Sequence, residues 1–402
     1  MEKMNIPFSP PDISDAEIAN VVKVLESGWI TTGPQTKNFE KEISTYCQTN
    51  KTICLNSATA CMEMCLRMLG IGEGDEVITS AYTYTASASV IDHVGAKIVL
   101  VDTKKDSYHL SYEELEKAIT PNTKAIIAVD VAGVMCDYDD IFKVVEGKRH
   151  LFQAKNEMQK CWNRVVVIAD AAHSLGAMYK GKMCGSVADF TSFSFHAVKN
   201  LTTGEGGALT WKSLGENIDE KIYKTINTLS LHGQTKDALA KNQIGAWEYD
   251  IIIPAYKCNM TDVQAAMGRT QLERYGGILA RRREIIATYS KGLPEGMKAL
   301  QHPNTDTQSS AHLYLTRVDG IEEKERNEII TKLAECGIST NVHYKPLPLL
   351  TAYKNLGFKI EYFPNAFAQY QNEITLPLYT RLTNEEVEYI ICCLGKVLGE
   401  KN

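Results

Sequence analysis

Residues 189–207 read Asp-Phe-Thr-Ser-Phe-Ser-Phe-His-Ala-Val-Lys-Asn-Leu-Thr-Thr-Gly-Glu-Gly-Gly, and this stretch decides the fold of the chain. Apolar and polar residues alternate from Ser192 to Ala197, which predicts a strand with one buried face. Lys199 therefore lies at or just past a strand end, and the three glycines after it allow the backbone to fold against a ligand. Because an isolated lysine is most often an exposed surface residue, a functional role depends on its companions in the sequence.

An aspartate closes the apolar run at residues 164–170, upstream of the lysine. The run predicts a strand buried on both faces of a parallel sheet, with Asp170 at its carboxyl end, where open α/β sheets place their ligands. A carboxylate there can hold a metal, orient a histidine or pair with a cationic ring nitrogen. Pyridoxal phosphate (PLP) requires a lysine amine to bond with its aldehyde and an acid to keep its ring nitrogen protonated. Asp170 followed by Lys199 fits both requirements.

A polar turn at residues 56–60 joins a short predicted strand, 52–55, to an apolar predicted helix, 61–69. A strand, a turn and a helix N-terminus together favour phosphate, because backbone N–H groups and the helix dipole both point at an anion. Ser57 and Thr59 add hydroxyl donors. Such a turn is commonly only a helix cap, so the phosphate interpretation depends on the lysine and the aspartate.

The pattern of the whole chain predicts an α/β protein. Short apolar strands alternate with helices, which is typical of a doubly wound, mainly parallel sheet. The 402 residues suit a large PLP-binding domain at 1–270 and a smaller C-terminal α/β domain at 271–402. A charged stretch at 144–164 predicts a longer surface helix with no assigned function, anchored to the body by Trp162 and Phe152.

Composition excludes several classes of partner. The 43 basic and 49 acidic residues give a net charge of −6 and are interspersed, so we expect neither nucleic acid nor membrane as a partner. The N-terminus has no apolar signal core, and we expect a cytoplasmic protein. The 11 cysteines form no zinc-binding pattern, so we expect no metal; Cys61 and Cys65, one helical turn apart, are expected to be small core side chains.

Two motifs carry a family resemblance. Asp170-Ala-Ala-His173 and the stretch from Ser194 to Gly207 resemble the core signature of the DegT-type nucleotide-sugar aminotransferases, a branch of the fold-type I PLP enzymes. Other motifs resemble that family in its own order along nearly the whole chain: Ser27-Gly-Trp-Ile-Thr-Thr-Gly-Pro34, Leu55-Asn-Ser-Ala-Thr-Ala60, Gly72-Glu-Gly-Asp-Glu-Val-Ile78, Tyr82-Thr-Tyr84, Ala255-Tyr-Lys-Cys-Asn-Met-Thr-Asp262 and Val342-His-Tyr-Lys-Pro346.

The resemblance implies a PLP-dependent aminotransferase in which Lys199 and Asp170 are the catalytic residues. By family position Tyr84 stacks on the pyridine ring, although spacing leaves Tyr82 open, and His173 contacts the side of the ring with the phenolic oxygen. Ser194 contacts the phosphate. The residues expected to contact the cofactor are Ser57, Ala58, Thr59, Tyr84, Asp170, His173, Ser194, Lys199, Lys257 and Asn259.

The resemblance also implies a homodimer with shared active sites, in which the loop at 255–262 reaches the phosphate of the partner's cofactor. Many members have Asn where Lys257 stands and Arg where Asn259 stands, so which of the two reaches the phosphate stays open. The expected donor is glutamate, and the expected acceptor is a 3-keto or 4-keto, 6-deoxy sugar on a nucleotide, for surface glycan biosynthesis. The sugar and the nucleotide stay open. His232 and His343 are candidates to touch that substrate, with a structural role as the alternative for each.

Other functions compete with transamination. A related PLP branch dehydrates the sugar, and a histidine replaces the lysine in its best-known members, so Lys199 favours transamination. Cysteine desulfuration would call for a catalytic cysteine, and Cys336, the nearest candidate, has no supporting motif. A non-catalytic regulator would bring a DNA-binding helix-turn-helix, which the sequence does not show. A protein that holds PLP without turnover is the remaining alternative, and a half-reaction with glutamate separates it from an enzyme.

Overall fold

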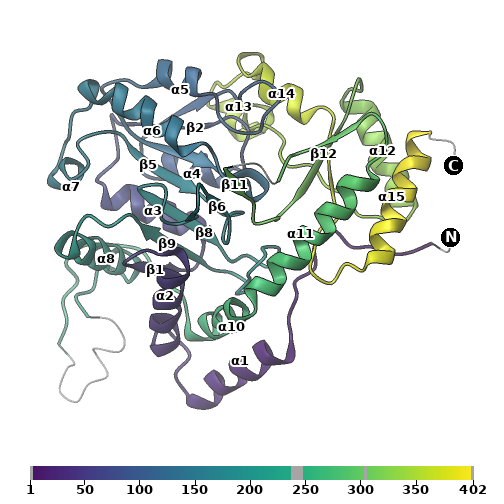
Figure 1. Cartoon of the computed structure of the whole chain (residues 1–402). Coiled ribbons are helices and arrows are strands. Elements are labelled where there is room, and N and C mark those ends of the chain that lie inside the picture. Colours follow the sequence, from purple (N-terminus) through teal and green to yellow (C-terminus); the bar gives the residue numbers. More distant parts are fainter. Residues whose placement is uncertain (1–2, 237–247, 303–305, 400–402) are drawn as a thin grey trace.

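The computed structural model describes residues 3–236, 248–302 and 306–399, and a seven-stranded sheet forms its centre (Figure 1). The sheet has the order β1-β9-β8-β5-β4-β2-β3. The neighbouring pairs from β3 to β8 are parallel, whereas β9 runs antiparallel to β8 and β1. The strands are β1 (Thr52–Leu55), β2 (Glu76–Ser80), β3 (Lys97–Val101), β4 (Thr123–Val129), β5 (Val166–Asp170), β8 (Phe190–Ser194) and β9 (Gly207–Trp211). The predicted mainly parallel sheet is confirmed.

Helices cover both faces of this sheet. Successive residues of a strand point to opposite faces, and Ile126 and Ile127 of β4 accordingly belong to different apolar cores. The core of one face includes residues of α3 (Ala58–Met68), α4 (Ala86–His93) and α8 (Glu216–Ser230). The core of the other face includes residues of α2 (Pro34–Cys47), α5 (Tyr112–Ala118), α6 (Tyr138–Gly147) and α10 (Asp262–Glu273). This is the doubly wound arrangement that the alternating pattern predicts.

A third core lies in the C-terminal part of the chain. It forms around the three-stranded sheet β10-β12-β13, with strands Met297–Ala299, Tyr314–Val318 and Glu373–Leu376. The helices α12 (Glu323–Glu335) and α15 (Asn384–Leu398) pack on this core. The long helix α11 (Tyr275–Gly292) takes part in two cores, with Ile278 in the core of the large sheet and Ile285 in this one (Figure 1). The predicted domain boundary between residues 270 and 271 falls inside the last turn of α10, shortly before α11, and stays a prediction.

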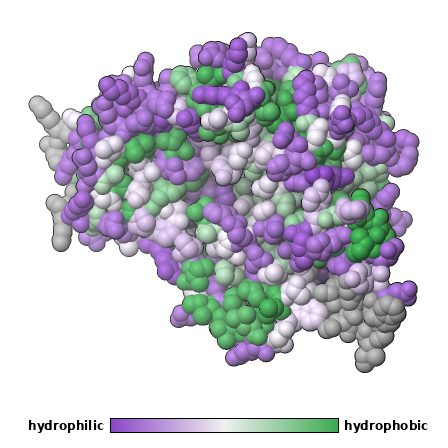
Figure 2. Space-filling model, turned by 180° about the vertical axis from the view of Figure 1, so that it is seen from behind, coloured by the Kyte–Doolittle hydropathy of each residue, from purple (hydrophilic) through white to green (hydrophobic). Residues whose placement is uncertain are grey.

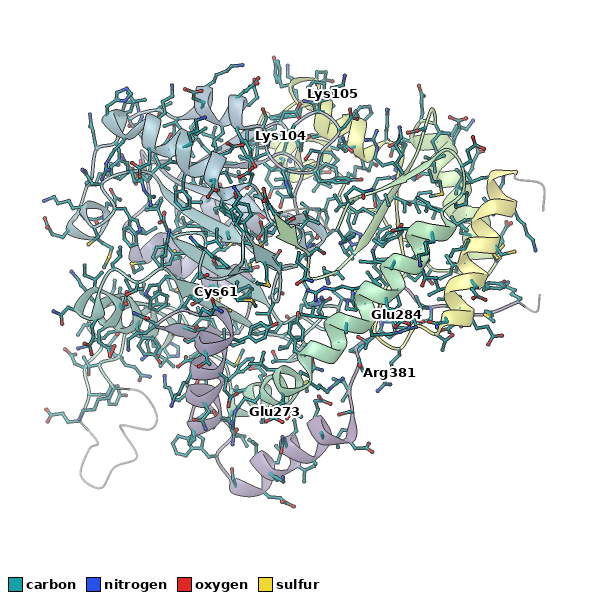
Figure 3. The ribbon with its side chains drawn as sticks, in the orientation of Figure 1. Cys61, Lys104, Lys105, Glu273, Glu284 and Arg381 are labelled. Atoms are coloured by element: carbon teal, nitrogen blue, oxygen red, sulfur yellow. The ribbon has the colours of Figure 1, made fainter. Side chains whose placement is uncertain are left out.

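The start of the chain is attached to the C-terminal part. Ile6 pairs with Ile338 in a parallel bridge and is fully buried in the third core. Asp12 lies 2.9 Å from the guanidinium of Arg381 (Figure 3) and 3.0 Å from that of Arg274. The helix α1 (Asp15–Ser27) follows, and Ser14 caps it in a capping box with Glu17. The N-terminal segment thus connects the two parts of the molecule.

The strand before the lysine differs from its prediction. We predicted a strand with one buried face, but Phe190–Ser194 is a central strand with covered residues on both faces. Ser192 is fully buried, and its hydroxyl donates to the carbonyl of Ala58 at 3.0 Å. A serine tolerates this burial because its hydroxyl is bonded. The polar residue Ser192 therefore marks contact with the start of α3 rather than an exposed face.

The charged stretch at 144–164 is not the single longer helix that we predicted. The helix α6 ends at Gly147, a short 3-10 turn follows at Arg149–Leu151, and α7 (Glu157–Lys160) is only one turn long. Trp162 is buried against the ring of Phe190 at 5.3 Å, as the predicted anchoring requires. Asn156 ends the irregular part, because its side chain caps α7 and also donates to the carbonyl of Leu69.

The remaining described elements are short, and three of them form a further three-stranded sheet of order β11-β6-β7. They are β6 (Met178–Tyr179), β7 (Lys182–Met183), β11 (Thr307–Gln308), α13 (Thr351–Asn355), α14 (Pro364–Tyr370) and the 3-10 turns Val131–Gly133, Leu347–Leu349 and Ile360–Tyr362. Cys61, on α3 (Figure 3), and Cys65 are fully buried. Across the described ranges, no helix combines the length and apolar character that a membrane crossing needs.

Candidate active site

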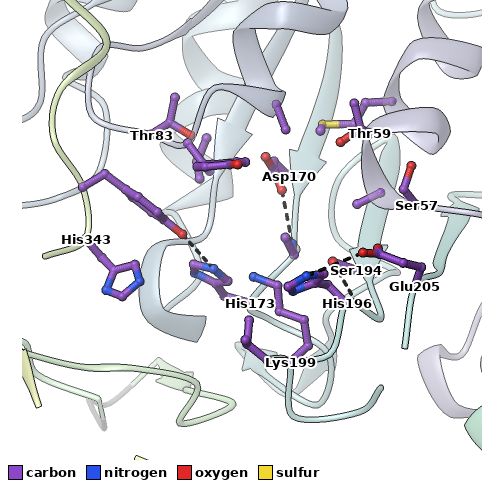
Figure 4. A pocket seen from close by; sticks show the side chains of 18 residues that line it. Ser57, Thr59, Thr83, Asp170, His173, Ser194, His196, Lys199, Glu205 and His343 are labelled. Carbon is purple, nitrogen blue, oxygen red and sulfur yellow. Dashed lines mark hydrogen bonds and ion pairs between the residues drawn. The ribbon is translucent and has the colours of Figure 1, made fainter. Parts of the chain in front are cut away.

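A cavity of about 370 Å³ opens at the carboxyl ends of the parallel strands (Figure 4). Segments far apart in the sequence line it: the ends of β5 and β8, the turn that carries Lys199, the start of α3, the segment after β2, and residues 343 and 344 from the C-terminal part. This is the edge of an open α/β sheet at which ligands bind. Of the ten predicted cofactor residues, the cavity brings together eight: Ser57, Ala58, Thr59, Tyr84, Asp170, His173, Ser194 and Lys199.

Asp170 is a buried carboxylate at the end of β5. It accepts a hydrogen bond from the hydroxyl of Ser87 at 2.6 Å and one from the backbone N–H of Ala172 at 3.2 Å. Burial raises the pKa of Asp170, and these two bonds and the charge of Lys199 oppose the rise. Both hydrogen-bond partners are neutral, so the cavity offers this carboxylate room for a cationic group.

Lys199 extends from a turn after β8 into the same cavity (Figure 4). The turn is closed by a bond from its backbone N–H to the carbonyl of His196 at 2.9 Å. Burial lowers the pKa of Lys199 to about 8, although the charge of Asp170 acts in the opposite direction. An amine with such a pKa is partly deprotonated near neutral pH, which is what a nucleophilic lysine needs.

The turn before α3 has the features of a phosphate site. Ser57 caps α3, and its side chain accepts the N–H of Ala60 at 3.0 Å. Gly207 of β9 lies directly behind the turn, where an added Cβ would come within 2.4 Å of the backbone nitrogen of Ala58. Only glycine permits this approach of strand and helix. The helix N-terminus and the hydroxyls of Thr59 and Ser194 face the cavity and favour an anion there.

The structure separates the two candidate tyrosines. Tyr82 is fully buried, and its hydroxyl donates to the carbonyl of His343 at 2.7 Å. Tyr84 is 61% exposed and lines the cavity. Of the two aromatic rings, the structure brings Tyr84 to the cavity, while its stacking on a cofactor ring stays a prediction.

His173 is held as a neutral ring with one defined tautomer. Its Nδ1 accepts the backbone N–H of Ala132 at 3.1 Å, so the proton of the neutral ring is on Nε2. That Nε2 lies 2.9 Å from the hydroxyl oxygen of Tyr344, to which it donates (Figure 4). Burial holds the pKa of His173 well below its usual value, which keeps the ring neutral. Tyr344 also lines the cavity, and its hydroxyl hydrogen is not used in this bond.

Among the cavity residues that the sequence does not mark as candidates are Tyr344, His196 and Glu205. Tyr344 stands directly after His343 in the motif Val342-His-Tyr-Lys-Pro346. His196 and Glu205 lie at the cavity, with 3.6 Å between the His196 Nε2 and a carboxylate oxygen of Glu205. Both belong to the lysine stretch, so their position close to Lys199 in sequence was the available signal.

Lys257 and Asn259 do not line the cavity of their own chain. Asn259 pairs with Leu55 in an antiparallel bridge, and its side chain donates to the hydroxyl of Thr32 at 2.5 Å. The amine of Lys257 contacts the side-chain oxygen of Asn259. Which of the two reaches a partner's cofactor stays a prediction. His232 is exposed and does not line the cavity.

The residues present fit PLP. Asp170, a buried carboxylate with neutral partners, suits a protonated ring nitrogen, and Lys199, with its lowered pKa, suits the aldehyde. The start of α3 suits the phosphate, and Gly207 allows the neighbouring strand to approach it closely. Among the described residues, no group of three or more His, Cys, Asp or Glu side chains is placed to hold a metal ion.

Comparisons with known proteins agree with this fit. The sequence model of the DegT/DnrJ/EryC1/StrS aminotransferase family matches residues 11–395. Spr1654 of Streptococcus pneumoniae, assigned as a sugar aminotransferase, has a solved PMP form with 58% identity and a TM-score of 0.95, covering 98% of this chain and 99% of that one. Its PLP form has 56% identity and a TM-score of 0.94, covering 98% of each chain.

Two further relatives are similar over nearly their whole length. The spore coat polysaccharide biosynthesis protein SpsC of Bacillus subtilis is 38% identical over 394 residues, which cover 96% of this chain and 95% of SpsC. The protein MJ1066 of Methanocaldococcus jannaschii is 39% identical over 401 residues, which cover 98% of each. The predicted fold class and the predicted cofactor, PLP, are therefore confirmed.

Proposed function

Because the chain belongs to the DegT/DnrJ/EryC1/StrS aminotransferase family, we propose that it moves an amino group from glutamate to a keto group of a nucleotide-linked sugar. The acceptor is of the 3-keto or 4-keto, 6-deoxy type, and the amino-sugar product serves the synthesis of a surface glycan. The observation that carries the proposal is the shared cavity, in which Lys199 and Asp170 lie beside the turn of Ser57. The sugar aminotransferase assignment of Spr1654 and the polysaccharide role of SpsC support the choice of substrate.

Each catalytic side chain has a defined task in this proposal. PLP, when bound, supplies an electron sink for the carbon that loses its proton. Asp170 would hold a proton on the ring nitrogen, since its own burial favours a close cationic partner. The amine of Lys199 would hold the aldehyde and, once freed by the amino donor, would move the proton that the donor's Cα loses.

The other residues of the cavity bind and orient. The start of α3, with Ser57, Ala58 and Thr59, would hold the phosphate together with Ser194. Tyr84 would cover one side of the ring, since its exposure leaves it free to pack on a planar group. His173 would contact the side of the ring with the phenolic oxygen.

We also propose a homodimer with shared active sites. Apolar side chains are exposed on and after α1, and Figure 2 shows an apolar patch where this helix projects. A second exposed apolar run lies at 249–256, directly before Lys257. Contiguous exposed apolar surface favours association with a partner. The exposed side chains are Ile18, Val22, Leu25 and Ile30 on the first surface and Tyr249, Ile251, Ile252, Ile253 and Tyr256 on the second. In this dimer Lys257 or Asn259 contacts the phosphate of the partner's cofactor.

A cytoplasmic location belongs to the same proposal. All eleven cysteines are free thiols, and most of them are buried. Unpaired thiols are typical of a reducing compartment. Nucleotide-linked sugars and glutamate are the substrates expected there.

One experiment tests the reaction. The holoenzyme is incubated with glutamate alone, and the absorbance of PLP is followed. It is then incubated with glutamate and a panel of nucleotide keto-sugars, and the products are identified by mass and NMR. We expect a half-reaction with glutamate and an amine at carbon 3 or carbon 4 of one sugar. A dehydrated sugar would favour the dehydratase, and an unchanged absorbance with glutamate would favour a PLP-binding regulator.

A further inference from the structure

A buried chain of hydrogen bonds lies behind His343, one of the residues that line the cavity. Glu373 and Thr375 stand two residues apart on β13, so their side chains share one face of the strand. The hydroxyl of Thr375 contacts Oε1 of Glu373, and the Nδ1 of His343 lies 2.9 Å from the same hydroxyl. The backbone N–H of His343 donates to Oε2 of Glu373 at 2.8 Å. The carboxyl group and the imidazole are therefore joined through a single hydroxyl.

The Thr375 hydroxyl has a single hydrogen, which couples the protonation of Glu373 to the tautomer of His343. When Glu373 is a carboxylate, Thr375 donates to it, so the hydroxyl oxygen must accept a hydrogen from Nδ1 of His343. Burial lowers the pKa of His343 to about 3, which keeps the ring neutral. A neutral ring protonated on Nδ1 has a bare Nε2. His343 then offers the cavity a hydrogen-bond acceptor.

Protonation of Glu373 reverses the direction of the hydrogen bonds that join it to His343. Oε2 of Glu373 is engaged by the backbone N–H of His343, so the proton is held on Oε1 and is donated to the Thr375 hydroxyl. Thr375 then donates its own hydrogen to Nδ1, and the ring carries its proton on Nε2. The sum is one proton gained by the carboxyl group and one ring proton moved from Nδ1 to Nε2. His343 then offers the cavity a donor.

We propose that Glu373 and Thr375 are positioning residues that set whether His343 accepts or donates a hydrogen bond to the sugar substrate. This rests on the proposed function, because it assigns His343 to the acceptor sugar. With Glu373 ionised, Nε2 accepts from a sugar hydroxyl; with Glu373 protonated, it loses that bond.

The surroundings of Glu373 place its titration in an accessible range. Its side chain is fully buried in the described structure, and burial raises its pKa to about 8. The groups that face it are His343, the guanidinium of Arg326, the phenols of Tyr82, Tyr108 and Tyr344, and Arg317, its cross-strand partner on β12. The Arg326 charge, the Thr375 hydroxyl and the His343 N–H favour the carboxylate, and the burial outweighs them. The acceptor form therefore gains as pH rises through about 8.

The test measures the ring directly. PLP-loaded protein labelled with ¹⁵N at histidine is studied by magic-angle-spinning NMR between pH 6.5 and 9.5, and the His343→Gln variant assigns the signals. We expect the proton of His343 to move from Nε2 to Nδ1 as pH rises. In Thr375→Ser the change should persist, in Thr375→Val it should be absent, and in Glu373→Gln the proton should stay on Nε2, because the amide NH₂ replaces the donor at Oε1.

A matched control and a kinetic readout complete the test. Thr316→Val removes a buried hydroxyl from the same sheet, one that donates to the carbonyl of Ile374 at 2.6 Å, outside the relay. It should leave the His343 signals unchanged. An unchanged tautomer in the parent protein, or a shift that Thr375→Val retains, overturns the relay.

The kinetic readout is KM for the keto-sugar. It should fall with rising pH in the parent and in Thr375→Ser but not in Thr375→Val, while kcat stays similar. If KM does not change when the tautomer of His343 changes, the contact between His343 and the sugar is overturned. Absence of turnover with every keto-sugar would count against the proposed function, while the NMR result on the relay would still stand.

Discussion

The hydroxyl oxygen of Tyr344 lies 2.9 Å from Nε2 of His173, and these residues belong to different parts of the chain. Because His173 is the donor in this pair, Tyr344 keeps its hydrogen for the cavity. In Tyr344→Phe the His173 N–H loses its acceptor. We expect the free energy of unfolding to fall by about 1–3 kcal/mol, the cost of a buried donor without a partner, and kcat to fall as well.

Chemical denaturation and steady-state kinetics measure these two effects. Tyr289→Phe is the matched control, because its buried hydroxyl donates to the carbonyl of Pro377 at 2.9 Å in the C-terminal core. The control should lose stability without losing kcat. Equal kcat values for the Tyr344 variant and the parent would contradict a role of this hydroxyl in the reaction.

Replacing Lys199 by alanine removes the amine that binds the aldehyde. We expect a folded dimer without the visible absorbance band of bound PLP, and a loss of turnover of roughly 10²-fold or more, the scale of a lost proton-transfer group. Absorbance spectra, size-exclusion chromatography and a transaminase assay measure the result. Lys104→Ala, which removes a lysine outside the cavity, is the control (Figure 3). An intact band in Lys199→Ala would refute the assignment of this lysine.

The lowered pKa of Lys199 predicts how the apoenzyme takes up PLP. Only the deprotonated amine attacks the aldehyde, and burial lowers the pKa of Lys199 to about 8. The rate of covalent PLP uptake should therefore rise with pH and level off above about 8. Stopped-flow absorbance across pH 6.5 to 9.5 measures it. A rate that keeps rising steeply to the top of this range would contradict a lowered pKa.

Asp170→Asn should lower the transaminase activity and raise the stability of the apo protein. Burial raises the pKa of Asp170, so the native protein binds a proton that the unfolded chain has already lost, and stability falls as pH rises toward the folded-state pKa. The asparagine has no charge to desolvate. We expect the apo variant to gain in melting temperature relative to the parent as pH rises, while transaminase activity falls. Calorimetry at several pH values and the glutamate half-reaction provide the comparison, and a variant with parental activity would exclude Asp170 as the partner of the ring nitrogen.

Gly207→Ala should weaken the binding of the cofactor phosphate. The new Cβ would come within 2.4 Å of the Ala58 backbone nitrogen, so the start of α3 must shift. Overpacking of this kind costs about 1–3 kcal/mol, and we expect a matching loss of PLP affinity in a fluorescence titration. Gly277→Ala on α11 is the control, since an added Cβ meets nothing within 4 Å there. Equal PLP affinities for the two variants would contradict a role of Gly207 in shaping the phosphate site.

The parts of the site that sequence reasoning predicted are those encoded within one short stretch. An apolar run that ends in Asp170 and a turn that begins a helix at Ser57 are local patterns, and their place at the carboxyl edge follows from parallel strands. The contact between His173 and Tyr344 joins residues 171 positions apart, and no local pattern encodes it. The same holds for Ser192, whose place in the alternation predicts an exposed face although its hydroxyl donates to the carbonyl of Ala58.

The long helix α11 contributes side chains to the core of the large sheet at one end and to the C-terminal core at the other. A helix that is packed at both ends resists hinge bending, because a wide rotation of one core relative to the other would separate one end of α11 from the residues it packs against. For a sugar nucleotide, the acceptor proposed above, entry and release would then require rearrangement of segments at the rim of the cavity rather than a clamshell motion.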